Sequence, residues 1–529
     1  MAFRQFDAKI ADTTLFAALI AASSTHGAGK PILEDTDRRP LTYKRLILGA
    51  LVLGSKLTEG TRRGEAVGVL LPNVNAMVVS LFGLNAFGRV AALLNFTAGS
   101  RNLVSAVRTG QISKVITSRR FVDQGKLDDV IAAIAAAEIA PGKRVSIVYL
   151  EDVAKSIGTL DKIKGVVRSL MPGSVHRGYA MRPEQTAVLL FTSGTEGTPK
   201  GVALSSRNLV ANARQIYSHA DGALSPADVM MNPLPMFHSY GLTAGSLMPL
   251  LSGLKVVLYP SPLHYKQIPK LIRETQATVM VATDTFLQGY GRAAEPDDLA
   301  SVRFVVAGAE RVKDATRALW AKGGTTIAEG YGATECSPVI ACNLPNDNRP
   351  GTVGRLLPGI EYRLDEVEGI SEGGKLVVRG PNVMLGYLHA DLPGVVTPPE
   401  GGWHDTGDIV VIDAEGFISI RGRAKRFAKI GGEMVSLAAV ETLASSIWPE
   451  GNHVVISLPD PRKGEQLVLI TDRPDADKSE LLRHAQAAGF PEMWVPKAVM
   501  VVGNIPVLGS GKIDYPAATE MVRQARALL

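Results

Sequence analysis

The stretch that decides the organisation of this 529-residue chain is Leu190-Phe191-Thr192-Ser193-Gly194-Thr195-Glu196-Gly197-Thr198-Pro199-Lys200-Gly201. The apolar run at residues 187–191 leads into it and predicts a buried strand. Ser205 or Ser206 can cap a helix that follows. Glycines let the backbone between them approach a ligand closely. Hydroxyl groups, backbone N–H groups and the Lys200 ammonium can then hold phosphate oxygens.

This loop differs from the Walker A loop of many nucleotide-binding proteins. In a Walker A loop the lysine follows a glycine and precedes Ser or Thr. Here Gly194, Gly197 and Lys200 are evenly spaced, with two residues between each pair. An ordinary polar turn is the alternative for a lone glycine-rich loop, so the rest of the chain has to decide between the two interpretations.

Bulk properties favour a multidomain globular enzyme. Hydrophobic content of 46% and charged content of 20% are typical of this class, and the length predicts roughly two to four domains. The net charge of +6 favours an acidic protein partner or an anionic membrane surface. The chain has no dense Lys/Arg block, which argues against nucleic acid as a partner.

The cysteines and the N-terminal region favour the cytoplasm. Cys336 and Cys342 have no metal-ligand companions at useful spacing and fit a reducing compartment. The apolar run at residues 15–22 imitates a signal peptide, but acidic residues interrupt the basic region before it, and Thr13 or Thr14 can cap an amphipathic helix instead. No apolar run reaches the ~20 residues that span a bilayer. We therefore expect a cytoplasmic protein, which leaves room for peripheral contact at the inner face of the membrane.

Strand and helix patterns alternate in the first part of the chain. Residues 67–71 and 90–94 are predicted strands with a predicted helix at 75–87 between them, which favours a parallel sheet covered on both faces. A helix is predicted at Val130–Ala140, closed by Pro141-Gly142. Residues 150–185 are expected to be an irregular, charged segment on the protein surface.

Polar groups recur at the ends of later predicted strands. Two prolines fix a bend within residues 232–241, which also holds an aromatic–histidine–aromatic cluster. A strand at 304–307 ends at Gly308-Ala309-Glu310, and another at 325–329 ends at Gly330-Tyr331-Gly332-Ala333-Thr334-Glu335. Because ligands of open α/β sheets bind at strand ends, these groups are expected to converge on one cleft.

The composition changes near residue 343. Short β-like segments at 361–364, 374–378, 409–412 and 417–420 predict a small antiparallel or barrel-like unit at about 343–422. We expect an N-terminal domain at 1–422 and a C-terminal domain at 423–529. The fold class is α/β, with a large N-terminal domain of parallel α/β sheets plus a small β-barrel, followed by a small mobile α+β domain.

Taken in order, these motifs resemble the adenylate-forming synthetases, which include acyl-CoA synthetases, luciferases and peptide-synthetase adenylation domains. The resemblance runs from about residue 41 to 514. Residues 263–265, 422–430, 432–436 and 508–512 look like the acyl-ACP synthetase half of the bifunctional bacterial acyl-ACP synthetase/2-acylglycerophosphoethanolamine acyltransferase. None of the nine histidines has the Asp five residues on that its acyltransferase domain would require, so the chain looks like a free-standing synthetase.

The resemblance implies ATP and Mg²⁺ as cofactors and gives roles to the motif residues. The loop would hold the β- and γ-phosphates, Thr334 the α-phosphate and Glu335 the metal. Tyr331, beside Gly332, would stack on adenine, and Asp408 would bind the ribose with help from Arg423. The backbone of Gly308, Ala309 and Glu310 would run alongside the adenine ring. The loop residues that would hold phosphate are Thr192, Ser193, Gly194, Thr195, Gly197, Thr198 and Lys200.

The same resemblance implies further roles. Lys512 would be the adenylation lysine, for which a solvated loop lysine is the alternative. His238 would lie near the substrate carboxylate, although a satisfied core histidine is the alternative. Lys425 would be the hinge of a mobile C-terminal domain. Phe237, Tyr240 and Gly241 would line the acyl pocket, and Gly431, Gly432 and Glu433 would form the pantetheine loop.

The acceptor of the acyl group is the open question. Glu196 stands where the wider family has a small hydroxyl residue, and Met434 stands where it has Asn, as in the acyl-ACP synthetase branch. The basic run of Lys425, Arg426 and Lys429 could meet the acidic helices of a carrier protein or be a solvated hinge surface.

The expected activity is therefore ATP-dependent activation of a long-chain fatty acid through acyl-AMP, with transfer to the phosphopantetheine thiol of holo-acyl carrier protein. An AMP-forming fatty acyl-CoA ligase is the alternative. A non-catalytic lipid or carrier-protein binding module and a membrane-associated ATPase belong to other classes, and the missing Walker loop weighs against the ATPase. The sequence does not predict acyl chain length or oligomeric state.

Overall fold

The structure is a computed structural model that describes residues 6–192, 199–370, 372–430, 433–460, 464–487, 491–507 and 513–527. The chain forms two compact units. The first comprises Met1–Pro350, Gly354–Glu361 and Arg379–His404, and the second comprises Gly351–Val353, Tyr362–Val378 and Asp405–Leu529. The domain boundary expected at residue 422 falls within the second unit and stays a prediction.

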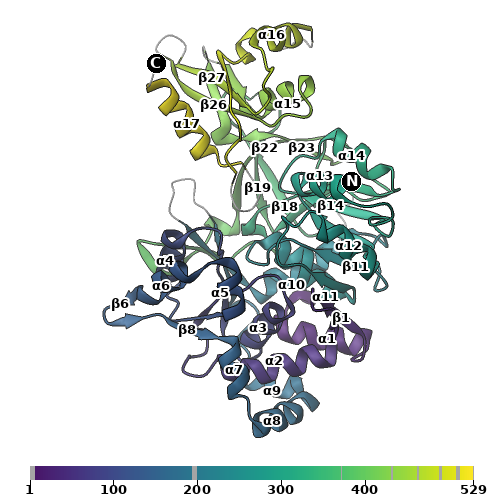
Figure 1. Cartoon of the computed structure of the whole chain (residues 1–529), viewed down its shortest axis with the longest axis vertical. Helices are drawn as coiled ribbons and strands as arrows, with labels where there is room; N and C mark the ends of the chain where they lie inside the picture. The colour runs from purple at the N-terminus through teal and green to yellow at the C-terminus, as the bar shows by residue number, and fades with distance from the viewer. Residues whose placement is uncertain are drawn as a thin grey trace. The chain divides into compact units, whose positions relative to one another are not determined.

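An eight-stranded sheet carries the glycine-rich loop of the first unit (Figure 1). In the spatial order that follows, the first three strands are antiparallel to their neighbours, and the remaining five run parallel to one another. In spatial order they are β21 (Leu392–Thr397), β20 (Gly386–His389), β10 (Lys200–Ser205), β9 (Thr186–Thr192), β4 (Val90–Leu93), β3 (Ala66–Val69), β5 (Lys114–Thr117) and β8 (Ser146–Tyr149).

A nine-stranded sheet carries the other predicted strand-end residues of the first unit. The strands from β15 to β1 are parallel, and antiparallel strands close both edges. In spatial order they are β17 (Arg355–Leu356), β16 (Val339–Cys342), β15 (Thr326–Gly332), β14 (Phe304–Gly308), β13 (Val279–Ala282), β11 (Val229–Asn232), β12 (Lys255–Leu258), β1 (Pro31–Glu34) and β2 (Leu41–Thr42).

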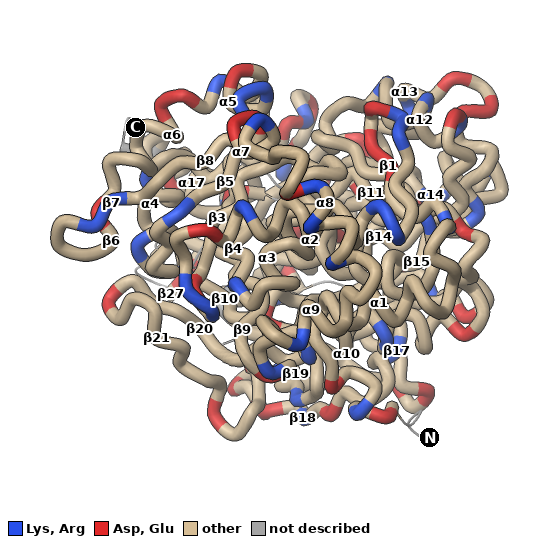
Figure 2. The backbone as a smooth tube through the Cα atoms, turned by 90° about the horizontal axis from the view of Figure 1, so that it is seen from below, with Lys and Arg blue, Asp and Glu red and all other residues tan. Residues whose placement is uncertain are grey.

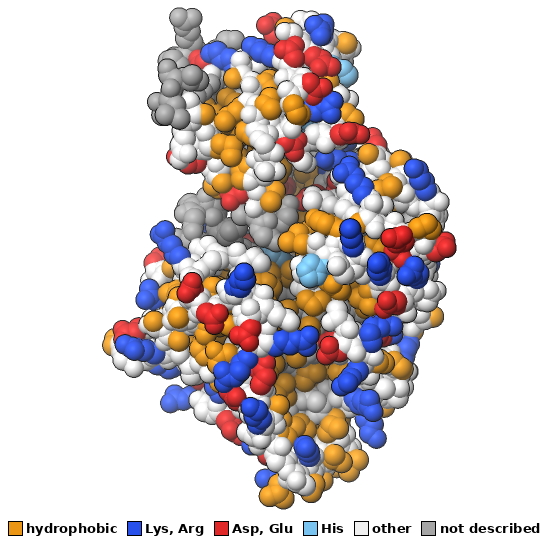
Figure 3. Space-filling model, in the orientation of Figure 1, with side chains coloured by type: hydrophobic (Ala, Val, Ile, Leu, Met, Phe, Trp, Pro, Cys, Tyr) orange, Lys and Arg blue, Asp and Glu red, His pale blue; other side chains and the backbone are white. Residues whose placement is uncertain are grey.

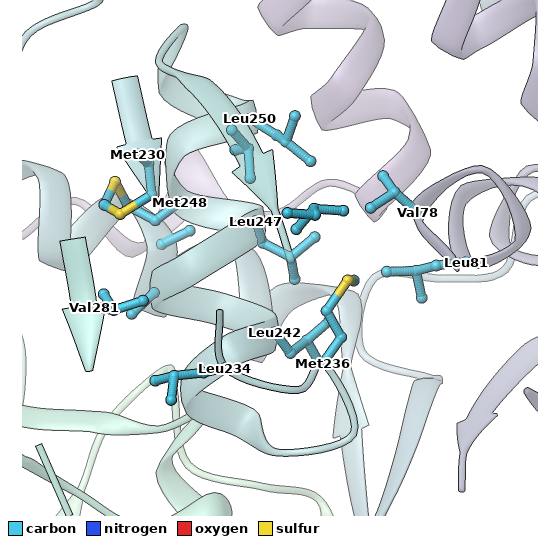
Figure 4. Close-up of a cluster of buried hydrophobic side chains, with 14 of the residues drawn as sticks. Val78, Leu81, Met230, Leu234, Met236, Leu242, Leu247, Met248, Leu250 and Val281 are labelled. Carbon is cyan, nitrogen blue, oxygen red and sulfur yellow. The ribbon is translucent and has the colours of Figure 1, made fainter. Parts of the chain in front are cut away.

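Most helices of the first unit bury apolar residues in its core. The strands are short runs of buried aliphatic residues, as expected for parallel sheets covered on both faces. Val78 and Leu81 of α3 belong to the same buried cluster as Met236 and Leu247 (Figure 4). The helices are α1 (Leu15–His26), α2 (Tyr43–Leu57), α3 (Asn75–Ala86), α4 (Ser100–Thr109), α5 (Arg119–Gly125), α6 (Asp128–Ala136), α7 (Leu150–Ser156), α8 (Thr159–Leu170), α9 (Pro172–Tyr179), α10 (Ser206–His219), α11 (Met248–Ser252), α12 (Gln267–Thr275), α13 (Asp284–Ala293) and α14 (Asp314–Ala321), with a π-helix, η2, at Tyr240–Leu247 and short 3₁₀ turns at Ala8–Ala11, Thr334–Cys336 (η3) and Glu400–Gly402.

The second unit contains a four-stranded and a five-stranded sheet. Two helices pack on one face of the five-stranded sheet and the C-terminal helix packs on the other, which is the small α+β arrangement expected from the sequence. The four strands are β18 (Glu361–Asp365), β19 (Gly374–Arg379), β22 (His404–Ile412) and β23 (Ile418–Arg423). The other elements are β25 (Glu433–Ser436), β24 (Phe427–Ile430), β27 (Gly464–Thr471), β26 (His453–Asp460), β28 (Ala498–Val501), α15 (Leu437–Ile447), α16 (Lys478–Ala487), α17 (Tyr515–Ala527) and 3₁₀ turns at Ala424–Arg426 (η5) and Glu492–Trp494.

The structure corrects two expectations about the region before the loop. The helix predicted at Val130–Ala140 ends at Ala136, and β6 (Glu138–Ala140) pairs with β7 (Lys143–Arg144). Gly142 has φ of 72°, a turn conformation that a glycine adopts easily and that reverses the chain there. Residues 150–185 are not irregular, because they contain α7, α8 and α9.

The N-terminal apolar run forms a helix, as the capping pattern predicts. The Thr14 side chain accepts a hydrogen bond from the Ala17 N–H at 3.2 Å and caps α1. Leu15, Phe16 and Leu19 are fully buried in the core of the first unit. Within the described parts of the chain, the structure contains no helix with the length and apolar character needed to cross a bilayer.

Candidate functional site

The glycine-rich loop connects two adjacent antiparallel strands. Thr192 at the end of β9 and Lys200 at the start of β10 are cross-strand partners. The helix expected to follow a cap at Ser205 or Ser206 is α10, which Ser205 caps after the end of β10, and Ser205 and Asn208 form a capping box with hydrogen bonds of 3.0 and 2.9 Å. Ser193, Gly194, Thr195, Glu196, Gly197 and Thr198 lie outside the described residues.

Tyr387 brings Lys200 and Glu335 into one arrangement. Its side chain comes from β20, where Tyr387 pairs with Val202 of β10. The Lys200 ammonium lies 5.5 Å from the centroid of the Tyr387 ring, and the Tyr387 hydroxyl donates a 2.7 Å hydrogen bond to Glu335 Oε1. Lys200 and Glu335, both predicted site residues, thus both contact the side chain of Tyr387, which no sequence motif had identified as a site residue.

Thr334 is connected to the proline-rich bend. Ser239 Oγ donates to Thr334 Oγ1 at 3.3 Å, and Ser239 is itself buried. Ser239 directly follows His238, whose ring lies 4.8 Å from the ring of Phe237. The predicted α-phosphate residue and the predicted carboxylate-binding segment are therefore neighbours in the fold. Sequence reasoning missed Ser239, although it lies within the motif.

Two buried asparagines hold the proline-rich bend in shape. The Asn73 amide donates to the Leu234 carbonyl at 2.5 Å and accepts from the Met236 N–H at 2.9 Å. Asn232 accepts from the Leu234 N–H at 3.1 Å and donates to the Gly241 carbonyl at 2.9 Å. Because buried polar groups are costly unless they are paired, these amides define the path of residues 233–241. Asn73 lies far away in sequence, so no local pattern could have identified it.

The expected acyl-pocket residues form a tight apolar corner. The Tyr240 hydroxyl donates to the Val306 carbonyl at 2.7 Å, and burial raises the pKa of Tyr240 well above its usual range. The phenol therefore stays protonated and acts as a structural donor. A Cβ on Gly308 would lie 3.0 Å from the Tyr240 ring. Phe237 packs edge-on against Phe96 with the ring centroids 4.9 Å apart.

Gly241→Ala is expected to lower stability, because the backbone of the bend lies too close to Gly241 to leave room for a side chain. A Cβ at this position would lie 2.4 Å from the Leu234 carbonyl oxygen. Overpacking of this kind costs about 1–3 kcal/mol. Thermal and urea unfolding would measure the loss. The matched control is Gly178→Ala in α9, where a Cβ has nothing within 4 Å and should be neutral or slightly stabilising. Equal stability of the two variants would contradict the packing argument.

The expected adenine segment follows β14. Ala309 has φ of 70°, an uncommon conformation for a residue other than glycine and one that clusters at functional sites. The Glu310 carboxylate accepts from the Thr285 N–H at 3.0 Å and the Thr285 hydroxyl at 2.9 Å, so it caps the start of α13. The Glu310 carboxylate is therefore engaged with α13, and the role of this segment beside adenine stays a prediction.

Tyr331 and Gly332 lie at the end of the neighbouring strand, β15. The Tyr331 side chain is only 9% exposed, and its backbone pairs with Ala341 of β16. A Cβ on Gly332 would lie 2.2 Å from the Pro338 carbonyl oxygen, so close packing requires glycine there. The C-terminal ends of β14 and β15 lie side by side through the Gly308–Gly330 pair. This is where parallel α/β sheets bind ligands.

The second unit brings Asp408 and Arg423 together. They are cross-strand partners in β22 and β23, and Arg423 Nε lies 3.4 Å from Asp408 Oδ1. The turn before Asp408 is made by its neighbours, since Asp405 accepts from the Gly407 N–H at 2.8 Å. Asp408 is therefore more than a turn residue, and its buried carboxylate is held by the exposed Arg423.

The other predicted residues of the second unit are only partly described. Lys425 lies in η5 between β23 and β24, and the structure does not describe its side chain. Glu433 begins β25, which pairs with β24, again without a described side chain. Val507 and Ile513, which flank the predicted adenylation loop, form an antiparallel bridge. Gly431, Gly432 and Lys512 lie outside the described residues.

Arg426 of the basic run contacts residues within the second unit. Arg426 forms an ion pair with Glu441 at 2.8 Å, donates to the Val455 carbonyl and stacks 3.7 Å from the Tyr515 ring centroid. Burial raises the pKa of Glu441, although Arg426 opposes the shift. Lys429 pairs with Glu368 at 3.3 Å. Arg426 is therefore held by contacts within the second unit, whereas Lys429 is exposed.

The described residues fit a magnesium ion that arrives with a nucleotide. Among them, no group of three or more His, Cys, Asp or Glu side chains is placed to hold a metal. Mg²⁺ usually takes one or two carboxylates together with substrate phosphates and water. Glu335 is the residue that would supply such a carboxylate, and the hydrogen bond from Tyr387 to Oε1 orients it. The adjacent Cys336 is not a reactive group, since burial raises the pKa of its thiol well above the usual range.

Comparisons with known proteins identify the family and relatives of similar fold. The profile of the family described as AMP-binding enzyme matches residues 20–388. The long-chain-fatty-acid–CoA ligase of Escherichia coli O157:H7 is 26% identical over 506 residues, covering 89% of this chain and 88% of the relative. That of Bacillus subtilis (strain 168) is 27% identical over 511 residues, covering 90% and 89%. The structure of ATP-bound MatB from Rhodopseudomonas palustris superposes with a TM-score of 0.79 at 23% identity, covering 97% and 98% of the chains.

Proposed function

Because the chain belongs to the AMP-binding enzyme family, we propose that it is an AMP-forming ligase that uses ATP and Mg²⁺ to join a long-chain fatty acid to the thiol of coenzyme A. The observation that carries this proposal is the arrangement of Lys200, Tyr387 and Glu335 at the foot of the glycine-rich loop. It combines a cation and an oriented carboxylate with a neighbouring sequence rich in glycine and hydroxyl residues, as Mg²⁺–ATP requires.

The relatives favour coenzyme A over acyl carrier protein as the acceptor. Both curated relatives described above are long-chain-fatty-acid–CoA ligases that align over nearly their whole length. The internal ion pair of Arg426 also removes one of the three cations expected to meet a carrier protein. Acyl carrier protein is the second candidate, which Glu196 and Met434 favour.

The proposed reaction has two steps. In the first, a carboxylate oxygen attacks the α-phosphorus of ATP, a new P–O bond forms, and pyrophosphate leaves. Two anions must meet, so catalysis depends on cations and oriented donors more than on an acid or a base. Mg²⁺, when bound, neutralises phosphate charge. In the second step the thiol attacks the acyl carbonyl and AMP leaves.

The residues of the first unit are proposed to act mainly in the first step. Lys200 and Thr192, at the two ends of the loop, hold the leaving phosphates. Thr334 is positioned by Ser239 to contact the α-phosphate, and Glu335 is oriented by Tyr387 to hold the metal. The tight corner around Tyr240, Gly241 and Gly308 is proposed to shape the acyl pocket. His238, within the bend, is proposed to lie near the substrate carboxylate.

The residues of the second unit are proposed to bind the ribose, assist adenylation and serve the transfer to the thiol. Asp408, held by Arg423, accepts hydrogen bonds from the ribose hydroxyls. Lys512 serves adenylation, and Lys425 is the hinge that separates the two steps. Residues 431–433 serve the thiol of pantetheine. A short turn between two sheets, such as η5, suits a hinge because few residues then absorb a backbone change.

One assay tests the function and the acceptor together. The protein is mixed with Mg²⁺–ATP and a long-chain fatty acid, with either coenzyme A or holo-acyl carrier protein, and thioesters and nucleotides are identified by mass. We expect acyl-CoA and AMP in equal amounts, and neither product without fatty acid. Preferential acylation of the carrier protein would reverse the choice of acceptor. ADP without a thioester would indicate an ATPase, and the absence of AMP and of both thioesters would refute the ligase.

A further inference from the structure

Helix α8 exposes its apolar side chains. Leu160, Ile163, Val167 and Leu170 are 71%, 54%, 60% and 73% exposed, and the adjoining Met171 is 64% exposed. A surface helix of a globular protein normally turns its apolar stripe toward the core. Hydrophobic side chains gather at the lower end of the face drawn in Figure 3, where α8 lies in Figure 1. Such a contiguous patch marks a surface that binds something.

Contacts between the opposite face of α8 and α2 determine which face of the helix is exposed. Gly165 is the one fully buried residue of the helix, and a Cβ there would lie 2.1 Å from a methyl group of Val52 in α2. Asp161, one turn earlier on the same face, pairs with Lys56 of α2 at 3.3 Å. The small and acidic residues thus pack on the protein. Turning the helix over would force bulky side chains against α2 and break the ion pair.

Basic residues surround the apolar stripe. Residues 155–182 contain six Lys or Arg and a single acidic residue, Asp161, which already faces Lys56. Lys162 and Lys164 are both exposed, and the helical period places them on opposite flanks of the stripe. Figure 2, which views the molecule from below, shows basic residues along α8. The surface is therefore apolar at its centre and cationic at its edges.

We propose that α8 is an interfacial helix that docks the first unit on an anionic lipid surface. An apolar stripe flanked by lysines matches the acyl region and the anionic headgroups of such a membrane. A second copy of the chain fits less well, because a symmetric contact through this face would bring two cationic rims together.

The docking goes beyond the proposed ligase activity and does not depend on it. One consequence does rest on that activity: docking would let the enzyme take its long-chain fatty acid from the membrane instead of from water. The two proposals can fail separately, because vesicle binding is measured without ATP, fatty acid or thiol.

Binding is measured by co-sedimentation with phosphatidylcholine vesicles that contain or lack phosphatidylglycerol. We expect binding to the anionic vesicles that weakens with salt and is at least about tenfold weaker without phosphatidylglycerol. The apolar variant combines Ile163→Ser, Val167→Ser and Leu170→Ser, and the charge variant combines Lys162→Glu and Lys164→Glu. Each is expected to weaken binding by about tenfold or more.

Matched controls carry similar changes away from α8. Leu392→Ser with Val395→Ser replaces exposed apolar residues of β21, and Lys266→Glu with Lys270→Glu reverses two exposed lysines at α12. Both controls should bind vesicles as the unaltered protein does. Because all the altered side chains are exposed, the variants should keep the same Tm, which is checked first.

Three results would overturn the proposal. The first is an unaltered protein that does not bind phosphatidylglycerol vesicles. The second is a pair of α8 variants that bind as well as their controls. The third is a dimer that the apolar variant converts to monomer without any change in vesicle binding, seen by light scattering after gel filtration. That last result would assign the face to a second copy of the chain.

Discussion

Replacement of Lys512 by alanine is expected to abolish acyl-adenylate formation while leaving the conversion of supplied acyl-adenylate to thioester nearly unchanged. The first step creates negative charge at the α-phosphate as the carboxylate attacks. A lysine that neutralises this charge contributes only to that step. Loss of one such group usually lowers the rate by about 10²–10³-fold. The second step expels AMP and is assigned to other residues, so the variant should separate the half-reactions.

The two half-reactions are measured separately. Fatty-acid-dependent release of pyrophosphate reports the first, and thioester formation from synthetic acyl-AMP reports the second. Lys497→Ala is a control from the same unit, because Lys497 is 62% exposed in its side chain and pairs with Asp460 at 2.7 Å. It should retain both activities. Equal loss of both half-reactions in Lys512→Ala would assign Lys512 a structural role instead.

The second large effect is expected at Glu335. Glu335→Gln keeps an oxygen that can accept the hydrogen bond from Tyr387 but removes the negative charge that holds Mg²⁺. We expect the rate of adenylation to fall by about 10²-fold or more, with partial recovery at high magnesium concentration. Initial rates of pyrophosphate release across a magnesium titration would measure this. Stability should change little, since the replacement keeps the size of the side chain.

Two further variants separate charge from orientation. Tyr387→Phe removes only the hydroxyl that orients Glu335, so it should lower adenylation by about tenfold and keep a normal response to magnesium. Glu310→Gln alters a carboxylate at the neighbouring strand end whose contacts with Thr285 cap a helix. It should affect stability more than the magnesium response. A Glu335→Gln enzyme with normal rates at low magnesium would remove Glu335 from the metal site.

Local patterns predicted the strand before the loop and the helix cap after it. The strand at residues 187–191 and the cap at Ser205 depend on residues close together in sequence, and both are present. The strand β10 between them was missed. Its residues follow a glycine-rich turn, and their strand conformation depends on pairing with β9 and β20. Partners that are distant in sequence leave no local pattern.

Helix α8 is a second element that local sequence patterns did not predict. Its alternation of lysines and aliphatic residues was taken as an irregular, charged surface, although the period is helical. The identity of the buried face depends on Val52 and Lys56 of α2, which the segment itself cannot reveal. The tertiary structure therefore turned an unremarkable charged stretch into a candidate membrane surface.

The sequence by itself determined the α/β class and the order of the strand-end motifs. It also supplied the candidate residue types for phosphate, metal and ribose, because glycines, hydroxyls and carboxylates act through their own chemistry. Only the tertiary structure decided which of these residues share a site. It placed Tyr387 between Lys200 and Glu335, put Ser239 against Thr334, and fixed the bend with Asn73. The reason is physical: side-chain chemistry is local, whereas strand register and burial are properties of the whole fold.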